Sequence, residues 1–352
     1  MKVETLLPLG KLDPGLRAAG APLDIRRVAE EAALAEALGY DGLVTEETKD
    51  DPYIVMALAA QATQRLELAT SVAIAFPRSP TVTAMAAWTL QKLSGGRFTL
   101  GLGPQVKGHI ERRFGLKWSP PGPWMRDYVE ALRAVWRCWQ DGARLDLHNA
   151  HYDLSLMVPL FAPGPIEHPD IPIHLAAVNP FMCRVAGEVA NGIRAHPVCT
   201  PRYIEDVMLP AARAGAAMAG RSFDGFEFCI KPLVAAAPDR AGLADKIRDV
   251  RARIAFYAST PTYLIAFETL GFGEVARELQ AYSRAQRWEE MPAFIGDEML
   301  DTYAVIGTYD EIAEKLRRRY GALVSAVEFA IPVPTEADRA VLRELIESLK
   351  RG

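Results

Sequence analysis

The sequence predicts an α/β protein built as a (β/α)8 TIM barrel, in which eight parallel strands close into a ring surrounded by helices. Short apolar, β-branched segments alternate with segments that carry apolar residues at helical spacing, a pattern typical of a parallel sheet. We count eight such units, and eight units favour a closed barrel over an open sheet. Because no change of composition marks a boundary along the 352 residues, we expect a single domain over 1–352.

The clearest unit begins at residue 66. Residues 66–74 form an apolar run of the kind found in strands buried on both faces. Prolines follow, and residues 81–93 then carry apolar side chains at helical spacing. The glycines at 95–96 end this helix, because glycine tolerates the left-handed backbone of a helix end. Residues 97–102 form a second buried strand, so the segment predicts two parallel strands joined by a crossover helix.

The other elements follow from the same patterns. We expect the remaining strands at residues 2–7, 41–45, 171–177, 192–195, 226–235 and 325–331. We expect the remaining helices at residues 24–38, 52–63, 123–139, 181–190, 201–217, 308–320 and 336–350. Two segments do not fit the alternation. Residues 144–154 predict a β-hairpin, and residues 260–296 predict a helical, aromatic insertion near the barrel mouth that lines a pocket or seals a lid.

Composition narrows the class of protein. Half of the residues are hydrophobic, and the net charge of −4 gives no reason to expect a nucleic-acid or membrane partner. The sequence contains no apolar run long enough for a transmembrane helix and no signal-peptide core at its start. The four cysteines are scattered, which indicates free thiols in a reducing compartment. We therefore expect a cytoplasmic protein that acts on a small molecule.

A barrel places its site at the carboxyl ends of its strands. The residues expected there are Glu46, Glu47, Thr48, 71–73, 103–109, 176–179, His196, Lys231 and Glu328. This set contains no convincing cluster of metal ligands, and the sequence has no nucleophile motif or Walker loop. Gly101-Leu-Gly103 lacks the third glycine of a dinucleotide-binding motif. Small residues beside hydrogen-bonding ones suit a large flat cofactor that performs the chemistry while the protein orients it.

Residues 68–82 and 93–103 resemble the bacterial-luciferase-like superfamily of flavin and deazaflavin oxidoreductases. Asp41-Gly-Leu, residues 173–177, 190–193 and 305–316 are similar to its other landmarks, so the resemblance covers nearly the whole chain. The ending 307–321 and the pair Ala195-His196 resemble the branch that uses coenzyme F-420, an 8-hydroxy-5-deazaflavin. The resemblance implies a luciferase-like TIM barrel with F-420 as cofactor and FMN as the alternative.

The resemblance also implies cofactor contacts. A non-prolyl cis peptide that backs the central ring in the family matches Ser71-Val72, and the loop that holds the cofactor tail matches 103–109. Where family members often have two glycines, this chain has Val178-Asn179. Basic side chains at Lys107, Arg112 and Arg113 fit an acidic tail, although a solvated loop would look the same. The expected cofactor-binding residues are Thr48, Thr70, Ser71, Val72, Gly103, Pro104, Gln105, Val106, Lys107, Ala176, Ala177, Val178, Asn179 and His196.

Four residues are candidates for proton transfer. Glu47 is preferred, because a carboxyl group buried beside an apolar ring has a raised pKa and can exchange a proton. Glu46, His109 and His196 are the alternatives, and each also has an ordinary structural interpretation. With F-420 the expected reaction is hydride transfer at C5 of the deazaflavin to or from a small organic substrate.

Two other functions stay open. With FMN, the protein would be a two-component monooxygenase supplied by a separate flavin reductase. The third possibility is a non-catalytic deazaflavin-binding protein, since a fold does not guarantee activity. Helices at 54–60 and 82–93 are apolar on more than one side, so we also expect a homodimer.

Overall fold

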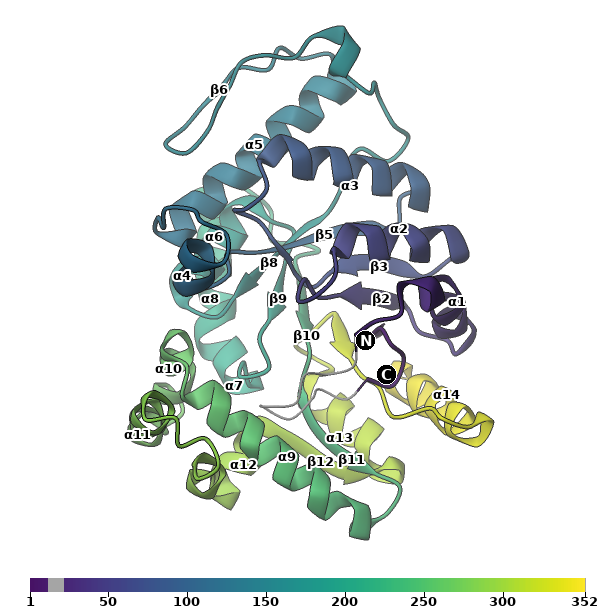
Figure 1. Cartoon of the computed structure of the whole chain (residues 1–352), viewed down its shortest axis with the longest axis vertical. Helices are drawn as coiled ribbons and strands as arrows, with labels where there is room; N and C mark the ends of the chain where they lie inside the picture. The colour runs from purple at the N-terminus through teal and green to yellow at the C-terminus, as the bar shows by residue number, and fades with distance from the viewer. Residues whose placement is uncertain (12–21, 352) are drawn as a thin grey trace.

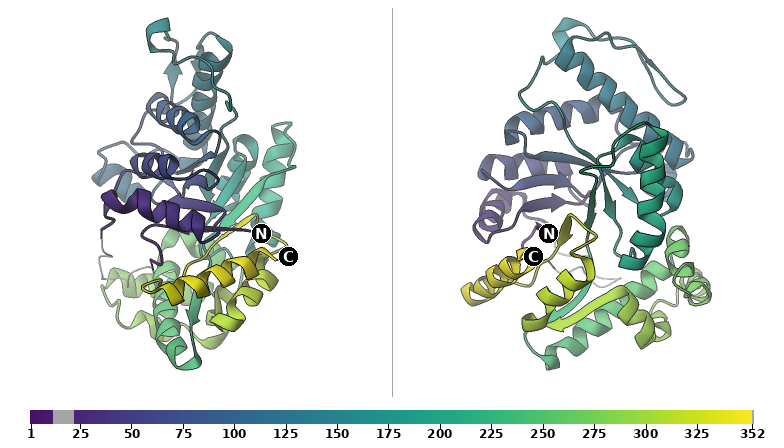
Figure 2. Two further views of the ribbon diagram at one scale, coloured as in Figure 1. Left: turned by 90° about the vertical axis from the view of Figure 1, so that its right-hand side faces the viewer. Right: turned by 180° about the vertical axis from the view of Figure 1, so that it is seen from behind.

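The computed structural model describes residues 1–11 and 22–351, and its centre is a closed ring of eight parallel strands (Figures 1 and 2). Each strand pairs with the next, β3 pairs with β5, and the first strand pairs with the last to close the ring. The strands are β1 (Lys2–Leu6), β2 (Gly42–Thr45), β3 (Glu67–Thr70), β5 (Phe98–Gly103), β8 (Ile173–Ala177), β9 (Gly192–Ala195), β10 (Glu227–Ile230) and β13 (Ala326–Glu328). The predicted TIM barrel is confirmed.

Helices cover the outside of the ring and bury their apolar faces against it (Figure 2). Side chains cap the first turn of several of these helices. Asp51, Ser79 and Asn179 each accept hydrogen bonds from backbone N–H groups in the first turn of the following helix. The covering helices include α1 (Val28–Ala37), α2 (Pro52–Ala62), α3 (Pro80–Ser94), α5 (Pro121–Asp141), α6 (Pro180–Val189), α8 (Leu209–Met218), α13 (Tyr309–Tyr320) and α14 (Glu336–Lys350). A short helix α7 (Pro201–Tyr203) and a π-helical turn (Ile204–Met208) precede α8.

The third strand is interrupted where the sequence predicted a continuous run over 66–74. After β3 the chain forms a cis peptide between Ser71 and Val72, as expected, and then continues as β4 (Ala73–Ile74), which pairs with the end of β5. Gly101 lies against this interruption, where a Cβ atom would be 1.8 Å from the carbonyl oxygen of Thr70. Only glycine fits there, so β5 approaches the interrupted strand closely.

One predicted strand is wrong in its extent. The apolar run 226–235 is divided between β10 in the barrel and β11 (Leu233–Ala237), which lies outside it. Pro232 stands at the break, where its missing N–H cannot support a ladder. β11 pairs in parallel with β12 (Ala304–Thr308), a strand that the sequence analysis did not predict, and both pack against α9 (Arg240–Ala258).

Three further segments leave the barrel. The hairpin of β6 (Leu147–His148) and β7 (Asp153–Leu154) is antiparallel as predicted and projects at the top of Figure 1. The loop after β5, expected to be irregular, contains the short helix α4 (Lys107–Arg112). Past α9 the chain forms the turn η4 (Pro261–Tyr263), α10 (Leu264–Glu268), α11 (Gly273–Arg284), the turn η5 (Met291–Phe294) and α12 (Asp297–Tyr303). Among the described residues, none of the helices combines the length and apolarity of a membrane span.

Candidate active site

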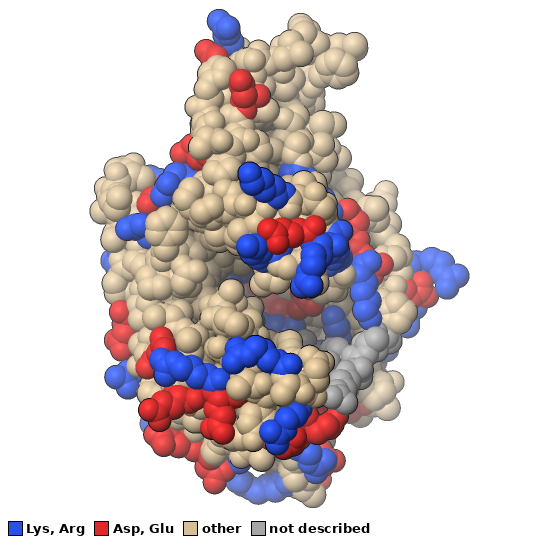
Figure 3. All heavy atoms as spheres, turned by 60° about the vertical axis from the view of Figure 1, so that its left-hand side comes forward, with Lys and Arg blue, Asp and Glu red and all other residues tan. Residues whose placement is uncertain are grey.

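A cavity of about 560 Å³ opens at the carboxyl ends of the barrel strands. Figure 3 shows a hollow across the middle of one face of the molecule, with charged side chains of both signs along its edges. Most of its accessible lining is apolar, and the residues that follow β2, β3, β5, β8, β9 and β10 all contribute to it. The volume and the mixed lining are typical of a site for a small molecule or cofactor.

The cavity gathers all of the predicted site residues except two. Thr70 is fully buried, and its hydroxyl donates to the carbonyl of Gly101 at 2.6 Å and accepts from the N–H of Gly101 at 2.9 Å. It therefore joins β3 to β5. His109 is exposed on α4 and does not line the cavity. Neither residue is in place to contact a molecule bound in the cavity.

One wall of the cavity is small and apolar. Val72 projects from the interrupted third strand against Gly103, and Ala176 lies beside them at the end of β8. A Cβ atom at position 103 would lie 2.6 Å from Cγ2 of Val72 and 3.5 Å from Cβ of Ala176. The missing side chain at 103 thus leaves room for Val72 at this wall.

Glu47 is held in place by several partners. Its carboxylate accepts the backbone N–H of Ile74 at 2.7 Å and the guanidinium of Arg78 at 2.7 and 2.8 Å. Arg78 also binds Asp51 at 2.9 Å. Burial would lower the pKa of Arg78, but its hydrogen bonds to Glu47 and the negative charge there raise it overall. Because the carboxylate is already engaged by the Ile74 N–H and by Arg78, this geometry suits positioning of the β4 turn better than proton exchange with a ligand.

Charged pairs form the rim of the cavity near Glu46. Lys231 lies 3.1 Å from the Glu46 carboxylate and 3.2 Å from that of Glu328, and Lys11 lies 3.6 Å from Glu46. All four side chains are partly exposed, so these contacts contribute little to stability. They do place a cation, Lys231, among the residues that line the cavity.

His196 lines the cavity beside two tyrosines. Its ring stacks on Tyr263 with centroids 4.0 Å apart and meets the edge of Tyr257 at 4.6 Å. Burial, with a smaller contribution from the charge of Lys231, lowers the pKa of His196 to about 3. The imidazole is therefore neutral at physiological pH. The N–H of Val198 donates to Nδ1 at 3.4 Å, which favours the tautomer that carries its proton on Nε2.

The floor of the cavity holds a buried ion pair that the strand-end rule missed. Arg194, in the middle of β9, forms a two-pronged contact with Glu4 of β1, with Nη2 3.1 Å from Oε1. Both side chains are buried, and both line the cavity together with Cys229. Burial would lower the pKa of Arg194, but Glu4 raises it overall, so the guanidinium stays charged. In the sequence, the signal that could have indicated this ion pair was an arginine within an otherwise apolar strand.

A family model, described as luciferase-like monooxygenase, matches residues 3–326. The chain belongs to this family. A protein of Mycobacterium tuberculosis without a described activity is 39% identical over 94% of this chain and 96% of its own length. A putative coenzyme F420-dependent oxidoreductase of the same organism is 32% identical over 82% of this chain and 86% of its own length.

Solved structures of low sequence identity share the luciferase-like fold. The coenzyme F420-dependent tetrahydromethanopterin reductase of Methanopyrus kandleri superposes with a TM-score of 0.74 at 20% identity, covering 99% of this chain and 97% of its own. The EDTA monooxygenase of Chelativorans superposes with a TM-score of 0.72 at 14% identity, covering 99% and 93%. At these identities the matches establish the fold and nothing more.

Within this luciferase-like chain, the departure at Val178-Asn179 has a local explanation. The Asn179 side chain caps α6 by accepting the N–H of Met182 at 2.9 Å, and the carbonyl of Val178 accepts the hydroxyl of Tyr203 at 2.9 Å. Both residues still line the cavity. The Asn179 side chain is occupied by the helix, so any contact with a ligand would come from the remaining backbone N–H groups.

Among the aromatic side chains of the insertion 260–296, Tyr263 lines the cavity. Phe267 and Phe272 instead pack on Tyr303, and Tyr282 packs on Phe294. The sequence did not single out Tyr257 of α9, which also lines the cavity. Its position at the end of a long helix gave no signal, because its place at the cavity depends on how α9 packs in the folded chain.

Proposed function

We propose that this luciferase-like protein is a coenzyme F420-dependent oxidoreductase that transfers a hydride between the deazaflavin and a small organic substrate. The observation that carries the proposal is the cavity wall of Val72, Gly103 and Ala176, an apolar surface of small side chains at the carboxyl ends of the strands. Relatedness supports it, since the Mycobacterium tuberculosis relative at 32% identity is itself described as a putative F420-dependent oxidoreductase.

The residues present fit the proposed cofactor. A planar tricyclic ring needs an apolar surface to support one face, which Val72 offers, and small neighbours that leave space for the ring, which Gly103 and Ala176 provide. The charged tail needs backbone N–H groups and positive charge near the mouth. The turn at Gln105, which adopts a left-handed backbone (φ 58°), and the partly solvated Lys107 lie there.

The bound coenzyme would supply the hydride at its C5 atom. The protein's own contribution, in our proposal, is to orient the substrate and to stabilise charge on its oxygen. His196 is neutral and its Nε2–H is free of described hydrogen-bond partners, so it can donate to a carbonyl or alcohol oxygen in the cavity. A neutral imidazole acts well in this role because it polarises the oxygen without being deprotonated. Tyr257 and Tyr263 hold the ring of His196 and exclude water.

The second candidate is an FMN-dependent monooxygenase, which agrees with the description of the matching family model as luciferase-like monooxygenase. The same wall would accommodate an isoalloxazine ring, so wall geometry does not separate the two cofactors. We prefer the deazaflavin because of the related F420-dependent oxidoreductase and the lysine at the tail end of the cavity. A purely cofactor-storing protein is disfavoured, because the cavity extends over Val72 to His196 and leaves room for a substrate.

A substrate screen tests the proposed reaction. The protein loaded with oxidised F420 is mixed with secondary alcohols and aldehydes without oxygen, and the protein loaded with reduced F420 is mixed with ketones and conjugated imines. We expect at least one compound to change the cofactor's absorbance with one-to-one stoichiometry. Oxygen-dependent hydroxylation of substrate, driven by reduced FMN from a reductase and absent with F420, would contradict the proposal.

A further inference from the structure

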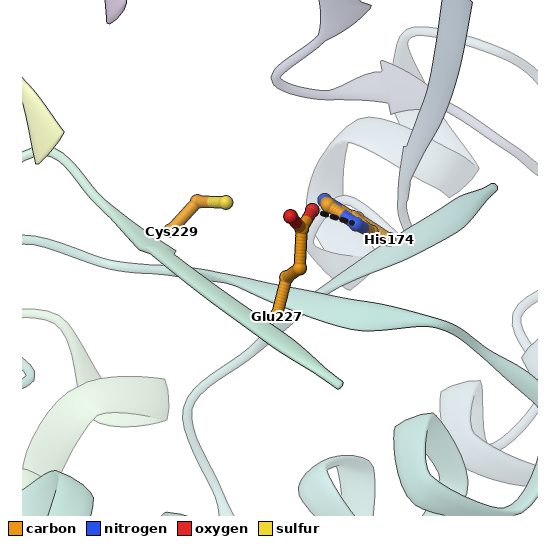
Figure 4. A group of neighbouring side chains, drawn as sticks. All are labelled: His174, Glu227 and Cys229. Carbon is orange, nitrogen blue, oxygen red and sulfur yellow. Dashed lines mark ion pairs between the residues drawn. The ribbon is translucent and has the colours of Figure 1, made fainter. Parts of the chain in front are cut away.

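We propose that His174, Glu227 and Cys229 form a binding site for a divalent transition-metal ion of the zinc class inside the barrel. One donor atom from each residue lies within 4.8 Å of the other two. Figure 4 shows the carboxylate of Glu227 between the sulfur of Cys229 and the imidazole of His174. The site is separate from the proposed cofactor wall and does not depend on the proposed function.

The strand register brings these residues together. His174 is the second residue of β8, and Glu227 is the first residue of β10. Both are register partners of Gly192, on the strand between them. A Cβ atom at position 192 would lie 2.8 Å from Nε2 of His174, so only glycine lets the imidazole cross β9 toward Glu227. Cys229 follows two residues after Glu227 and therefore points to the same face of the sheet.

The histidine lacks the partners that a buried imidazole normally has. Its side chain is 2% exposed, and Nε2 lies 3.2 Å from Oε2 of Glu227. Within the described part of the chain, neither ring nitrogen makes a hydrogen bond of acceptable geometry. Buried polar atoms without hydrogen bonds are rare in native proteins and call for an explanation. A metal ion would give one of these two nitrogens a partner.

The formal charges of the surrounding residues sum to a value that an added cation could neutralise. Lys2 lies 2.8 Å from Glu67 and 3.6 Å from Glu227, and Arg194 pairs with Glu4. With the imidazole and the thiol uncharged, two positive and three negative charges give this group a net charge of −1. A divalent ion that displaces the thiol proton brings the sum to zero. A protonated His174 would also do so, and the experiment must separate these two states.

The donor set identifies the class of metal. Imidazole nitrogen, carboxylate oxygen and thiolate sulfur together suit Zn²⁺ and its neighbours rather than Mg²⁺ or Ca²⁺. Tetrahedral coordination at ordinary bond lengths separates ligand atoms by about 3.5 Å. The His174–Glu227 pair at 3.2 Å already meets this spacing, so only the longer separations, of up to 4.8 Å, would have to shorten by about 1 Å. Water would take the fourth position. The ion would link β8 to β10 across Gly192 of β9. One of its ligands, Cys229, also lines the cavity.

Metal analysis of the full-length protein tests the proposal directly. The protein is purified without a polyhistidine tag and without chelator, and its zinc content is measured per chain. It is then stripped with chelator and titrated with cobalt chloride. We expect about one equivalent of zinc, and on titration a thiolate-to-cobalt charge-transfer band that saturates at one equivalent, together with visible bands of tetrahedral intensity.

Two substitutions identify the ligands. Cys229→Ser should remove the charge-transfer band and weaken cobalt binding at least tenfold, whereas Cys138→Ser, at a half-buried cysteine outside the cluster, should retain both. His174→Gln should weaken binding while the charge-transfer band persists at high cobalt. Should Cys229→Ser fail to fold, the melting temperature of the unaltered protein decides: it should fall on chelation and recover with zinc.

The result that would overturn the proposal is equally clear. The folded protein would contain no such site if three results came together. It would carry less than a tenth of a zinc ion per chain and show no thiolate-to-cobalt band. Its melting temperature would change neither with chelator nor with zinc. His174 and Glu227 would then be an ordinary ion pair.

Discussion

Val72 and Gly103 meet where the third strand of the barrel is interrupted: a Cβ atom at position 103 would lie 2.6 Å from Cγ2 of the valine. This distance is far below van der Waals contact. The two residues are thus fitted to each other, and together they form the apolar wall on which we place the cofactor ring. Any side chain at 103 must displace Val72 or enter the cavity itself.

The first prediction concerns this contact. Gly103→Val should raise the dissociation constant for F420 at least about fivefold, because overpacking of this kind costs about 1–3 kcal/mol. Cofactor fluorescence measures the binding. Gly296→Ala is the matched control, since a Cβ there meets nothing within 4 Å, and it should leave binding unchanged. Equal affinities of the two variants would remove Gly103 from the cofactor site.

The second prediction concerns the pH dependence contributed by His196. Its pKa is about 3 in the folded protein and about 6.5 when unfolded, so the unfolded chain binds the extra proton between these values. The contribution of the neutral imidazole to stability is complete above pH 6.5 and is lost as the pH falls toward 3. At pH 5 the loss is about 2 kcal/mol. His196→Gln should flatten the stability profile by this amount in urea denaturation, and an unchanged slope would contradict the buried neutral state.

The third prediction separates two roles for Glu47. If the carboxylate positions the β4 turn, Glu47→Gln should lower the free energy of unfolding by about 3 kcal/mol by leaving Arg78 without its main partner, since both side chains are largely buried. A double-mutant cycle with Arg78→Gln should give a coupling above about 1 kcal/mol. Asp206→Asn, at the exposed pair with Arg202, should change stability by less than about 0.5 kcal/mol.

The catalytic readout completes this test. A positioning role predicts that folded Glu47→Gln protein retains measurable turnover, with its pH–rate profile unchanged in shape. Complete loss of turnover in a folded variant that still binds F420 would restore Glu47 as the proton-exchanging group.

The fourth prediction concerns assembly. Ile54 of α2 and Val82, Met85 and Leu93 of α3 are each about half exposed, and the two helices pack side by side. Apolar patches of this kind mark interaction surfaces. We expect a homodimer through this surface, so Met85→Asp should shift the mass in light scattering toward the monomer. Met218→Asp changes an apolar residue of similar exposure on α8 and should leave the mass unchanged. A monomeric unaltered protein would refute the expectation.

The sequence predicted those features that depend on local pattern. Apolar runs and capping residues located the barrel strands and most helices, and the strand-end rule then placed Glu46, Glu47 and His196 at one cavity. The resemblance to a known family added the cis peptide before Val72. These predictions hold because strand ends in a closed parallel barrel all face the same side.

Features that depend on distant partners could not be predicted in this way. The division of the run 226–235 into β10 and β11 requires β12 as a pairing partner, and β12 lies about seventy residues later in the chain. The contact between Arg78 and Glu47 joins two loops 31 residues apart in the chain, so no local pattern indicates it. The cluster of His174 and Glu227 lies near the amino-terminal ends of its strands, which the strand-end rule does not consider.

The central claim is the identity of the cofactor, and its most direct test is a titration of the apo-protein with oxidised F420 and, separately, with FMN. Cofactor fluorescence follows both titrations. We predict a micromolar or tighter dissociation constant for F420 and binding of FMN at least tenfold weaker. Lys107→Ala should reduce the affinity for F420. Tight binding of FMN with weak binding of F420 would contradict the account and move the search to oxygen-dependent chemistry with a partner reductase.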